Sequence, residues 1–187
     1  NLQTGDAAMA LPSLESGEAD LTIAALPDSV PRQVVFLKML ETPLIFIGPR
    51  NPEELGQSLS LANLSKVPVI MPKRGLSRKR CERWFAQKNI TPAVYSSVAG
   101  NEAMIAMVAM GCGIGVVPRL VLENSPLRSR IRVLDVRPAL DPFSVGACTT
   151  RSLKRRPVVQ AFWHIAEQEI LNRYTTRGID ENHSDNK

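Results

Sequence analysis

The sequence is poor in the residues on which metal centres and disulfide frameworks depend. Its 187 residues include two histidines, three cysteines and 5% aromatic residues. The three cysteines, Cys81, Cys112 and Cys148, are odd in number and widely spaced, and they form no C-x-x-C or Cys/His pattern. We therefore predict no metal site, and we interpret the cysteines as reduced thiols of a cytoplasmic protein.

The sequence also lacks a long apolar run and a plausible catalytic base. No stretch approaches the ~20 apolar residues that cross a bilayer, so no membrane partner is expected. His164 lies among apolar neighbours of an expected helix, and His183 lies near the chain end. A nucleophile oriented by histidine and carboxylate cannot be assembled, so we predict no catalytic residue, no cofactor and no enzyme.

Charge favours one sign, with 23 Lys and Arg against 18 Asp and Glu, which gives a net charge of +5 and a pI near 9.4. A small anionic metabolite, nucleic acid or a merely solvated basic surface all fit this excess. The basic runs at residues 78–80 and 154–156 are not interleaved with aromatic residues, which argues against nucleic-acid binding by this chain itself. The first residue is Asn and no targeting signal follows it, so we expect a cut or processed chain.

Short β-rich runs alternate with helical stretches, a pattern that predicts an α/β protein with a largely parallel sheet. The break at residues 48–52 and another near residue 141 predict that the chain leaves one lobe and returns to it. Two such lobes would enclose a hinged cleft. We expect lobe one at residues 1–50 and 142–171 and lobe two at residues 51–141. A disordered tail is expected at 172–187, because that segment is polar and lacks periodicity.

Two loops combine polar residues with an expected helix start. Lys73-Arg74-Gly75-Leu76-Ser77 follows an expected strand, and so does Gly100-Asn101-Glu102. Ser77 and Asn101 could simply cap their helices, but a helix N-terminus also attracts carboxylates, so capping and ligand binding both stay open. The glycines at residues 111–115 follow a helix and precede a strand, the reverse of a dinucleotide fingerprint, and are interpreted as a helix cap and a tight turn into the strand.

Two segments resemble the effector-binding domain of LysR-type transcriptional regulators. They are LESGEADLTIA at residues 14–24 and GCGIGVVP at residues 111–118, and the resemblance extends from residue 1 to about residue 170. It implies two Rossmann-like lobes of the periplasmic-binding-protein type 2 fold. Residues 100–126, with GDAA at 5–8 and Phe162-Trp163, are similar to the branch of this family that activates the acetohydroxy acid isomeroreductase gene of isoleucine and valine biosynthesis.

The resemblance implies a cytoplasmic sensor of 2-acetolactate or 2-aceto-2-hydroxybutyrate, acting as a homodimer or homotetramer. DNA would be bound only through an N-terminal helix-turn-helix that is absent from this sequence. The first strand and helix of lobe one are also expected to be missing, so lobe one would be N-terminally truncated. The family pattern places the effector contacts at Ala24, Ala25, Lys73, Arg74, Gly75, Ser77, Gly100, Asn101 and Glu102.

Two other functions compete with this one. A solute-binding receptor of a transport system would share the fold, but export would favour paired cysteines, and the three here are odd in number. An enzyme on the same fold would need a catalytic group that the sequence does not offer.

Overall fold

The computed structural model describes residues 1–5, 7–26, 30–51, 53 and 64–184, and its backbone divides into two units. Unit 1 comprises Asn1–Ala8 and Glu41–Phe143, and unit 2 comprises Met9–Leu40 and Ser144–Lys187. The return crossing thus lies close to the expected position. The first crossing falls at Leu40/Glu41 instead of residues 48–52, because strand pairing continues through that expected break as far as Pro49.

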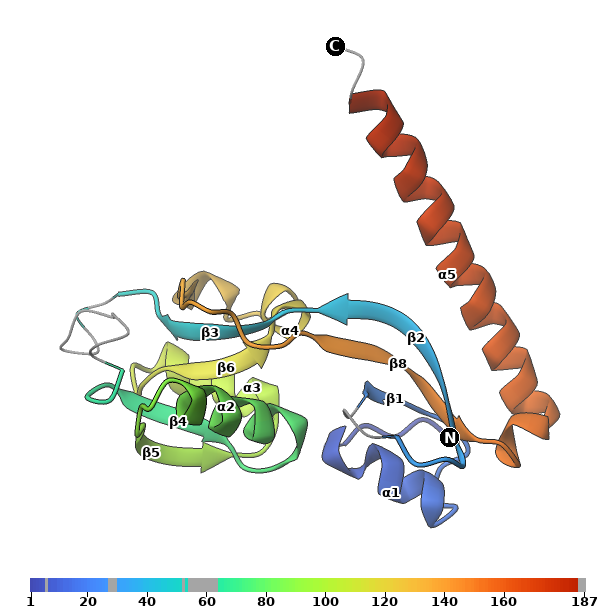
Figure 1. The fold of residues 1–187 in the computed structure, drawn as a ribbon, viewed down its shortest axis with the longest axis horizontal. Coiled ribbons are helices and arrows are strands. Elements are labelled where there is room, and N and C mark those ends of the chain that lie inside the picture. Colours follow the sequence, from blue (N-terminus) through green and yellow to red (C-terminus); the bar gives the residue numbers. More distant parts are fainter. Residues whose placement is uncertain (6, 27–29, 52, 54–63, 185–187) are drawn as a thin grey trace. The chain divides into compact units, whose positions relative to one another are not determined.

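Unit 1 is built around a strand that pairs on both of its edges (Figure 1). Strand β3 (Leu44–Pro49) runs antiparallel to β6 (Gly115–Pro118) and to β7 (Ile131–Val133). Strands β4 (Pro68–Pro72) and β5 (Ala93–Val98) form a parallel pair, and a parallel bridge between Val69 and Ile114 connects this pair to the β6 side. The expected parallel sheet is therefore only partly present, because β3 runs against its neighbours.

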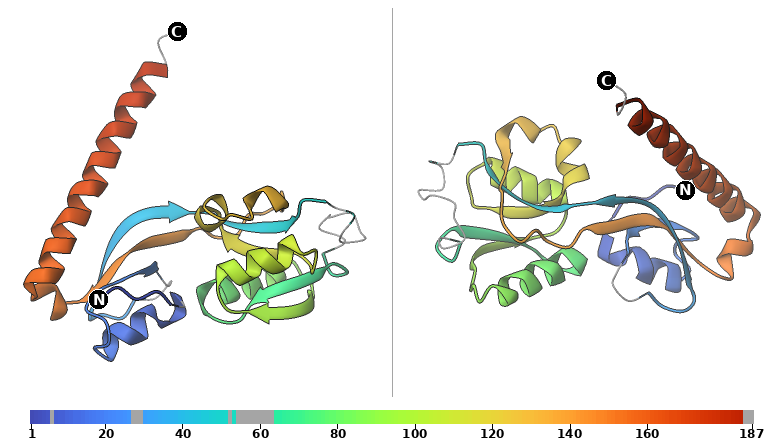
Figure 2. Two further views of the ribbon diagram at one scale, coloured as in Figure 1. Left: turned by 180° about the vertical axis from the view of Figure 1, so that it is seen from behind. Right: turned by 45° about the horizontal axis from the view of Figure 1, so that its top comes forward.

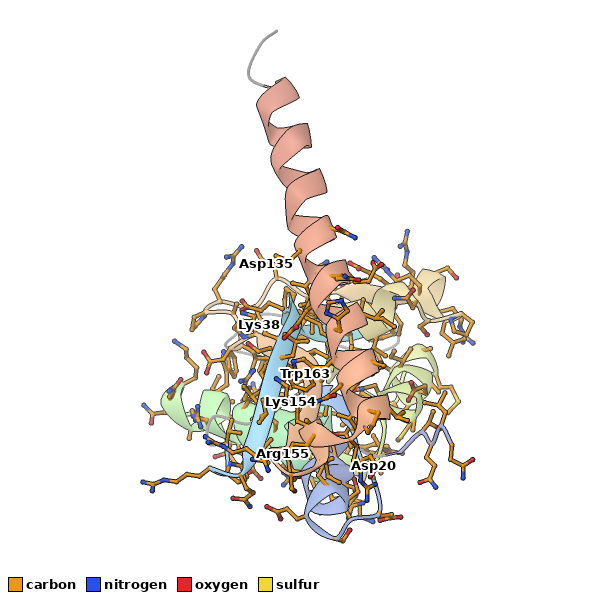
Figure 3. The ribbon with its side chains drawn as sticks, turned by 90° about the vertical axis from the view of Figure 1, so that its right-hand side faces the viewer. Asp20, Lys38, Asp135, Lys154, Arg155 and Trp163 are labelled. Atoms are coloured by element: carbon orange, nitrogen blue, oxygen red, sulfur yellow. The ribbon has the colours of Figure 1, made fainter. Side chains whose placement is uncertain are left out.

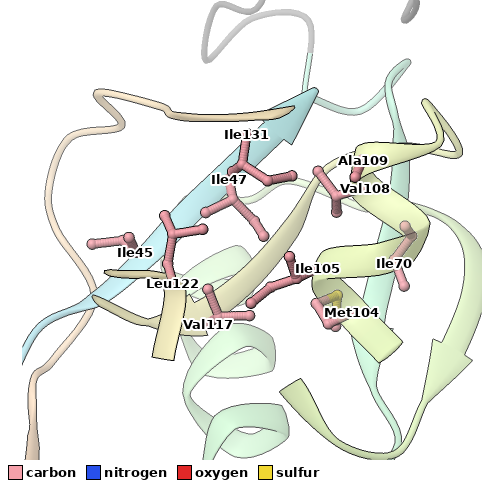
Figure 4. Packing of buried hydrophobic residues seen from close by; sticks show 10 residues of the cluster. All are labelled: Ile45, Ile47, Ile70, Met104, Ile105, Val108, Ala109, Val117, Leu122 and Ile131. Carbon is pink, nitrogen blue, oxygen red and sulfur yellow. The ribbon is translucent and has the colours of Figure 1, made fainter. Parts of the chain in front are cut away.

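Helices α2 (Gly75–Gln87) and α3 (Asn101–Ala109) cover opposite faces of these strands (Figure 2). Along β3, Phe46 packs against the rings of α2, with its centroid 5.0 Å from Trp84 and 6.1 Å from Phe85. Its neighbours Ile45 and Ile47 point to the other face, as strand geometry requires. There they join a buried cluster with residues of α3, β4, β6, β7 and the short helix α4 (Arg119–Glu123); Figure 4 shows Ile45, Ile47, Ile70, Met104, Ile105, Val108, Ala109, Val117, Leu122 and Ile131.

The glycine-rich turn after α3 ends the helix and leads tightly into a strand, as its position between a helix and a strand predicts. Gly111 has a φ of +78°, in the left-handed region used to end helices. At Gly113 a Cβ atom would lie 2.4 Å from the carbonyl oxygen of Pro68, so the turn needs glycine for the close approach. The turn thus leads the chain from α3 into β6.

Unit 2 contains a second sheet, in the order β1 (Thr22–Ala25), β8 (Phe143–Thr150) and β2 (Val34–Thr42). Helix α1 (Ala10–Glu15) contributes Leu14 to a small cluster with Val34 and Cys148. At Gly146 of β8 a Cβ atom would lie 2.0 Å from the carbonyl oxygen of Leu37, so the approach of β8 to β2 requires glycine.

Helix α5 (Pro157–Ser184) begins where the sequence predicts it, with proline as its first residue. Val159, Trp163 and Ala166 are buried along one stripe, and Lys154 lies 4.3 Å from the Trp163 ring (Figure 3). The helix continues to Ser184, beyond residue 172, from which a disordered tail is expected; residues 185–187 lie outside the described residues. Extending an existing helix costs far less than nucleating one, so weak periodicity alone does not end it.

Candidate functional site

The ends of β4 and β5 bring the two predicted anion-binding loops together in unit 1. The parallel register places Pro72 opposite Val98, and the backbone N–H of Lys73 donates to the carbonyl oxygen of Val98 at 2.7 Å. Helices α2 and α3 begin within three residues of these strand ends. The structure therefore sets two helix N-termini side by side at the carboxyl edge of a parallel pair, where ligands of open α/β sheets bind.

Neither helix has the side-chain cap that the sequence predicts. The N-cap of α2 is Arg74, in an extended conformation, and the N-cap of α3 is Gly100, and no side-chain cap hydrogen bond forms at either. Ser77 and Asn101 lie within the helices instead, so their prediction as caps is wrong. Because the first N–H groups of a helix have no partner within it, both helix starts keep backbone donors for a polar ligand.

Glycine is required at both helix starts. Gly75 has a φ of +82° and Gly100 a φ of +86°, a region that other residues rarely adopt. A Cβ atom at position 75 would lie 3.2 Å from the Cβ of Ala8, so the N-terminal segment of unit 1 passes directly beside the start of α2. At position 100 a Cβ atom would lie 3.6 Å from Oε2 of Glu102. The Glu102 carboxylate therefore lies beside the N-terminus of α3.

The charges around these loops are mostly exposed. The side chains of Lys73, Arg74 and Glu102 are accessible to solvent, and those of Ser77 and Asn101 are partly so. The backbone N–H of Lys73 is occupied by Val98, so only its ammonium group remains to attract an anion.

Arg78 joins this site, although the sequence shows it only as part of a basic run. Its Nη1 lies 3.3 Å from the carbonyl oxygen of Pro72 and 3.3 Å from Oγ of Ser97, and its Nε donates to Glu82 at 2.5 Å. The guanidinium therefore reaches the ends of both β4 and β5. The available sequence signal is its position in the first turn of the expected helix, next to Ser77.

Of the nine predicted contact residues, seven lie in unit 1 at these two helix starts, and Ala24 and Ala25 lie in unit 2. In β1 these alanines pair with Gly146 and Val145 of β8, and the Ala24 side chain is buried. They can offer a ligand only a methyl group or a backbone group.

Other kinds of site are not found in the described part of the chain. No group of three or more His, Cys, Asp or Glu residues there could hold a metal ion, and no helix there is both long and apolar enough to cross a membrane. All three cysteines are free, and burial is the main cause that raises the pKa of the Cys81 thiol to about 12. A thiol of that pKa stays protonated near neutral pH and is a poor nucleophile.

Solved structures of similar fold are regulatory domains. The CcmR regulatory domain from Synechocystis, in complex with 2-PG, has a TM-score of 0.75 at 21% identity, covering 89% of this chain and 80% of that one. The cofactor-binding domain of the Cbl transcriptional regulator has a TM-score of 0.70 at 25% identity, covering 89% and 72% respectively. The predicted α/β fold of the periplasmic-binding-protein type 2 is thereby confirmed.

The proteins with similar sequences include transcriptional regulators of known name. The HTH-type transcriptional regulator IlvY of Escherichia coli is 39% identical over 169 residues, which cover 88% of this chain and 57% of IlvY. The IlvY activator of Haemophilus influenzae is 35% identical over 169 residues, covering 89% and 58%. The chain thus spans little more than half the length of these curated relatives. A family model described as LysR substrate binding domain matches residues 1–170, and the chain belongs to that family.

Proposed function

We propose that this chain is the effector-sensing domain of a LysR-type DNA-binding regulator, and that its effector is 2-acetolactate or 2-aceto-2-hydroxybutyrate. The regulator would control an isoleucine and valine biosynthesis gene, as the 39% identity to IlvY of Escherichia coli suggests. It would act in the cytoplasm as a homodimer or homotetramer, and would reach DNA through a helix-turn-helix outside this sequence. The observation that carries the proposal is the Pro72–Val98 register, which places two uncapped helix N-termini side by side.

The start of α2 suits the carboxylate of such an acid. The free N–H groups of its first turn and the helix dipole favour a negative charge there. Lys73 and Arg74 add positive charge at the same end of the helix, and Nη1 of Arg78, whose Nε is paired with Glu82, reaches the strand ends there. Ser77, in the first turn, supplies a hydroxyl that can donate to a carboxylate oxygen or accept from a ligand hydroxyl.

The start of α3 suits a hydroxyl group better than a second carboxylate. The Glu102 carboxylate lies beside Gly100, where it can accept a hydrogen bond from a ligand hydroxyl but would repel a second anionic group. An acetohydroxy acid has one carboxylate and a hydroxyl on the adjacent carbon, and its keto oxygen can accept from Asn101. The site therefore discriminates in favour of hydroxy monocarboxylates and against dicarboxylates.

A thermal-shift titration with both acetohydroxy acids, using valine and pyruvate as controls, tests the assignment. A ligand at ~100 times its dissociation constant stabilises the folded state by about 2.7 kcal/mol. The shift should disappear in Arg74→Ala or Ser77→Ala. It should persist in Lys79→Ala, which removes an exposed charge from the same helix. No shift with either acid, in a chain that melts cooperatively, would refute the effector assignment while leaving the family membership intact.

A further inference from the structure

The net positive charge of the chain is confined to unit 1. By sequence, unit 1 carries fourteen Lys and Arg against nine Asp and Glu, whereas unit 2 carries nine of each. The whole excess of +5 therefore belongs to one unit. A charge excess of this kind on one part of a protein points to a binding surface for an anion.

Four arginines of unit 1 are neutralised by nearby carboxylates. The ion pairs are Arg78–Glu82 at 2.5 Å, Arg83–Asp141 at 3.8 Å, Arg119–Glu123 at 3.9 Å and Arg137–Asp135 at 2.8 Å. Within the described residues, Arg50, Arg128, Arg130 and Arg132 have no such carboxylate partner. We name these four residues the arginine cluster.

The arginine cluster gathers at one end of the β3–β7 pair. Arg132 lies opposite Gly48 in the antiparallel register, and the backbone N–H of Arg50 donates to the carbonyl oxygen of Arg130 at 2.8 Å. Arg128 belongs to the same short helical turn as Arg130. Arg50 and Arg130 continue the β3–β7 pairing by one residue, which sets two like charges opposite one another, an arrangement that favours a bound anion.

Two guanidinium groups of the arginine cluster form hydrogen bonds to backbone carbonyl oxygens. Nη1 of Arg128 donates to the carbonyl oxygen of Ile131 at 3.1 Å, and Nη2 of Arg130 donates to that of Ala109 at 2.9 Å. Each of these guanidinium groups has further N–H donors to offer. Nε of Arg132 is buried and has no hydrogen-bond partner, so this guanidinium can offer a phosphate only its outer N–H groups.

We propose that the arginine cluster binds the phosphate backbone of duplex nucleic acid without reading its sequence. All four members are arginine, whose planar guanidinium matches phosphate geometry better than the lysine ammonium does. Arg50, Arg128 and Arg130 are exposed, which suits an extended polyanion better than a small ligand enclosed in a pocket. The contact would add to the one expected through a helix-turn-helix, and it is separate from the effector site at the starts of α2 and α3.

Fluorescence anisotropy of the 187-residue chain with a labelled duplex of about 20 base pairs tests the proposal. Binding is measured from roughly 25 to 200 mM KCl, since each neutralised phosphate adds about one unit to the slope of log affinity against log salt. The test variant is R50Q/R132Q, whose two side chains make no hydrogen bond within the described residues. The matched control is R32Q/R151Q, which removes two exposed arginines from unit 2.

We expect R50Q/R132Q to weaken binding at low salt by about tenfold and to reduce the salt slope by about 2, with no change in R32Q/R151Q. Should the double variant unfold, R50Q alone should reduce the slope by about 1. Equal losses in both double variants would overturn the proposal, as would a parent chain that does not bind duplex at low salt. Equal affinity for labelled polyglutamate would also overturn it, because the site would then not select phosphate. The acetohydroxy acid titration is independent of all these outcomes.

Discussion

The stability of unit 1 should depend strongly on Arg80, a buried cation in the middle of α2. The residue is only 7% exposed, and its Nη1 donates to the carbonyl oxygens of Asp141, at 2.9 Å, and Pro142. Its guanidinium carbon also lies 4.6 Å from the centroid of the Phe143 ring. Arg80 therefore connects helix α2 to residues 141–142, which precede β8.

Replacing Arg80 by Met keeps most of the apolar stem but removes these interactions. A hydrogen bond from a charged donor contributes about 1.5–3 kcal/mol, and a cation–π contact about 0.5–2 kcal/mol. The two carbonyls would also lose their buried donor. We expect the free energy of unfolding to fall by about 3–5 kcal/mol, a large part of the 5–15 kcal/mol typical of a domain. For a chain of this size the melting temperature would fall by roughly 10 °C.

Urea unfolding followed by far-UV circular dichroism and by tryptophan fluorescence measures this loss. The matched control is Lys79→Met, which removes the neighbouring charge on the exposed side of the same helix and should stay within about 0.5 kcal/mol of the parent. If Arg80→Met and Lys79→Met unfold at the same urea concentration, the carbonyl contacts of Arg80 contribute nothing and the reasoning fails.

Two further predictions concern a buried thiol and a crowded turn. Because the folded pKa of Cys81 is raised from its ordinary value of 9.0 to about 12, unfolding releases a proton above pH 9, and stability should fall by up to ~1.4 kcal/mol per pH unit between those values. Urea midpoints at pH 8 and pH 10 should show a steeper decline in the parent than in Cys81→Ala. Gly113→Ala should lower the melting temperature much more than Gly17→Ala, because its Cβ would lie 2.4 Å from the Pro68 oxygen, whereas at Gly17, with a φ of +74°, nothing lies within 4 Å. Equal losses in the two glycine variants would show that the turn relaxes without cost.

Much of the local structure follows from sequence patterns. Proline at position 157, the apolar stripe of Val159 and Trp163, and the glycine after α3 each have a single strong local interpretation, and the structure agrees with them. The direction of strand β3 in unit 1 does not follow from the sequence pattern. Alternating strands and helices indicate a parallel sheet, whereas β3 is antiparallel to both of its neighbours. The chain enters unit 1 along β3, which runs against β6 and β7, and only tertiary pairing reveals that direction.

The sequence predicts the loops of the candidate site but not that they lie side by side. A strand, a polar loop and a helix start are visible at residues 73–77 and 100–102, but their adjacency depends on the Pro72–Val98 register, which is not a local property. Ser77 and Asn101 have good capping side chains, but neither is a cap, because both stand just inside helices that start with glycine-permitted backbone angles.

Helix α2 connects the proposed effector site to the segment through which the chain returns to unit 2. Its first turn carries backbone N–H groups that have no partner within the helix, while Arg80 and Trp84 further along it donate to carbonyl oxygens of the returning segment, the latter to Pro138 at 2.8 Å. A helix rises only 1.5 Å per residue and is stiff over two or three turns, so a displacement at its start moves these donors with it. The proposed effector site and the chain just before Ser144 are thus in contact with one and the same helix. These contacts lie entirely within unit 1, which ends at Phe143.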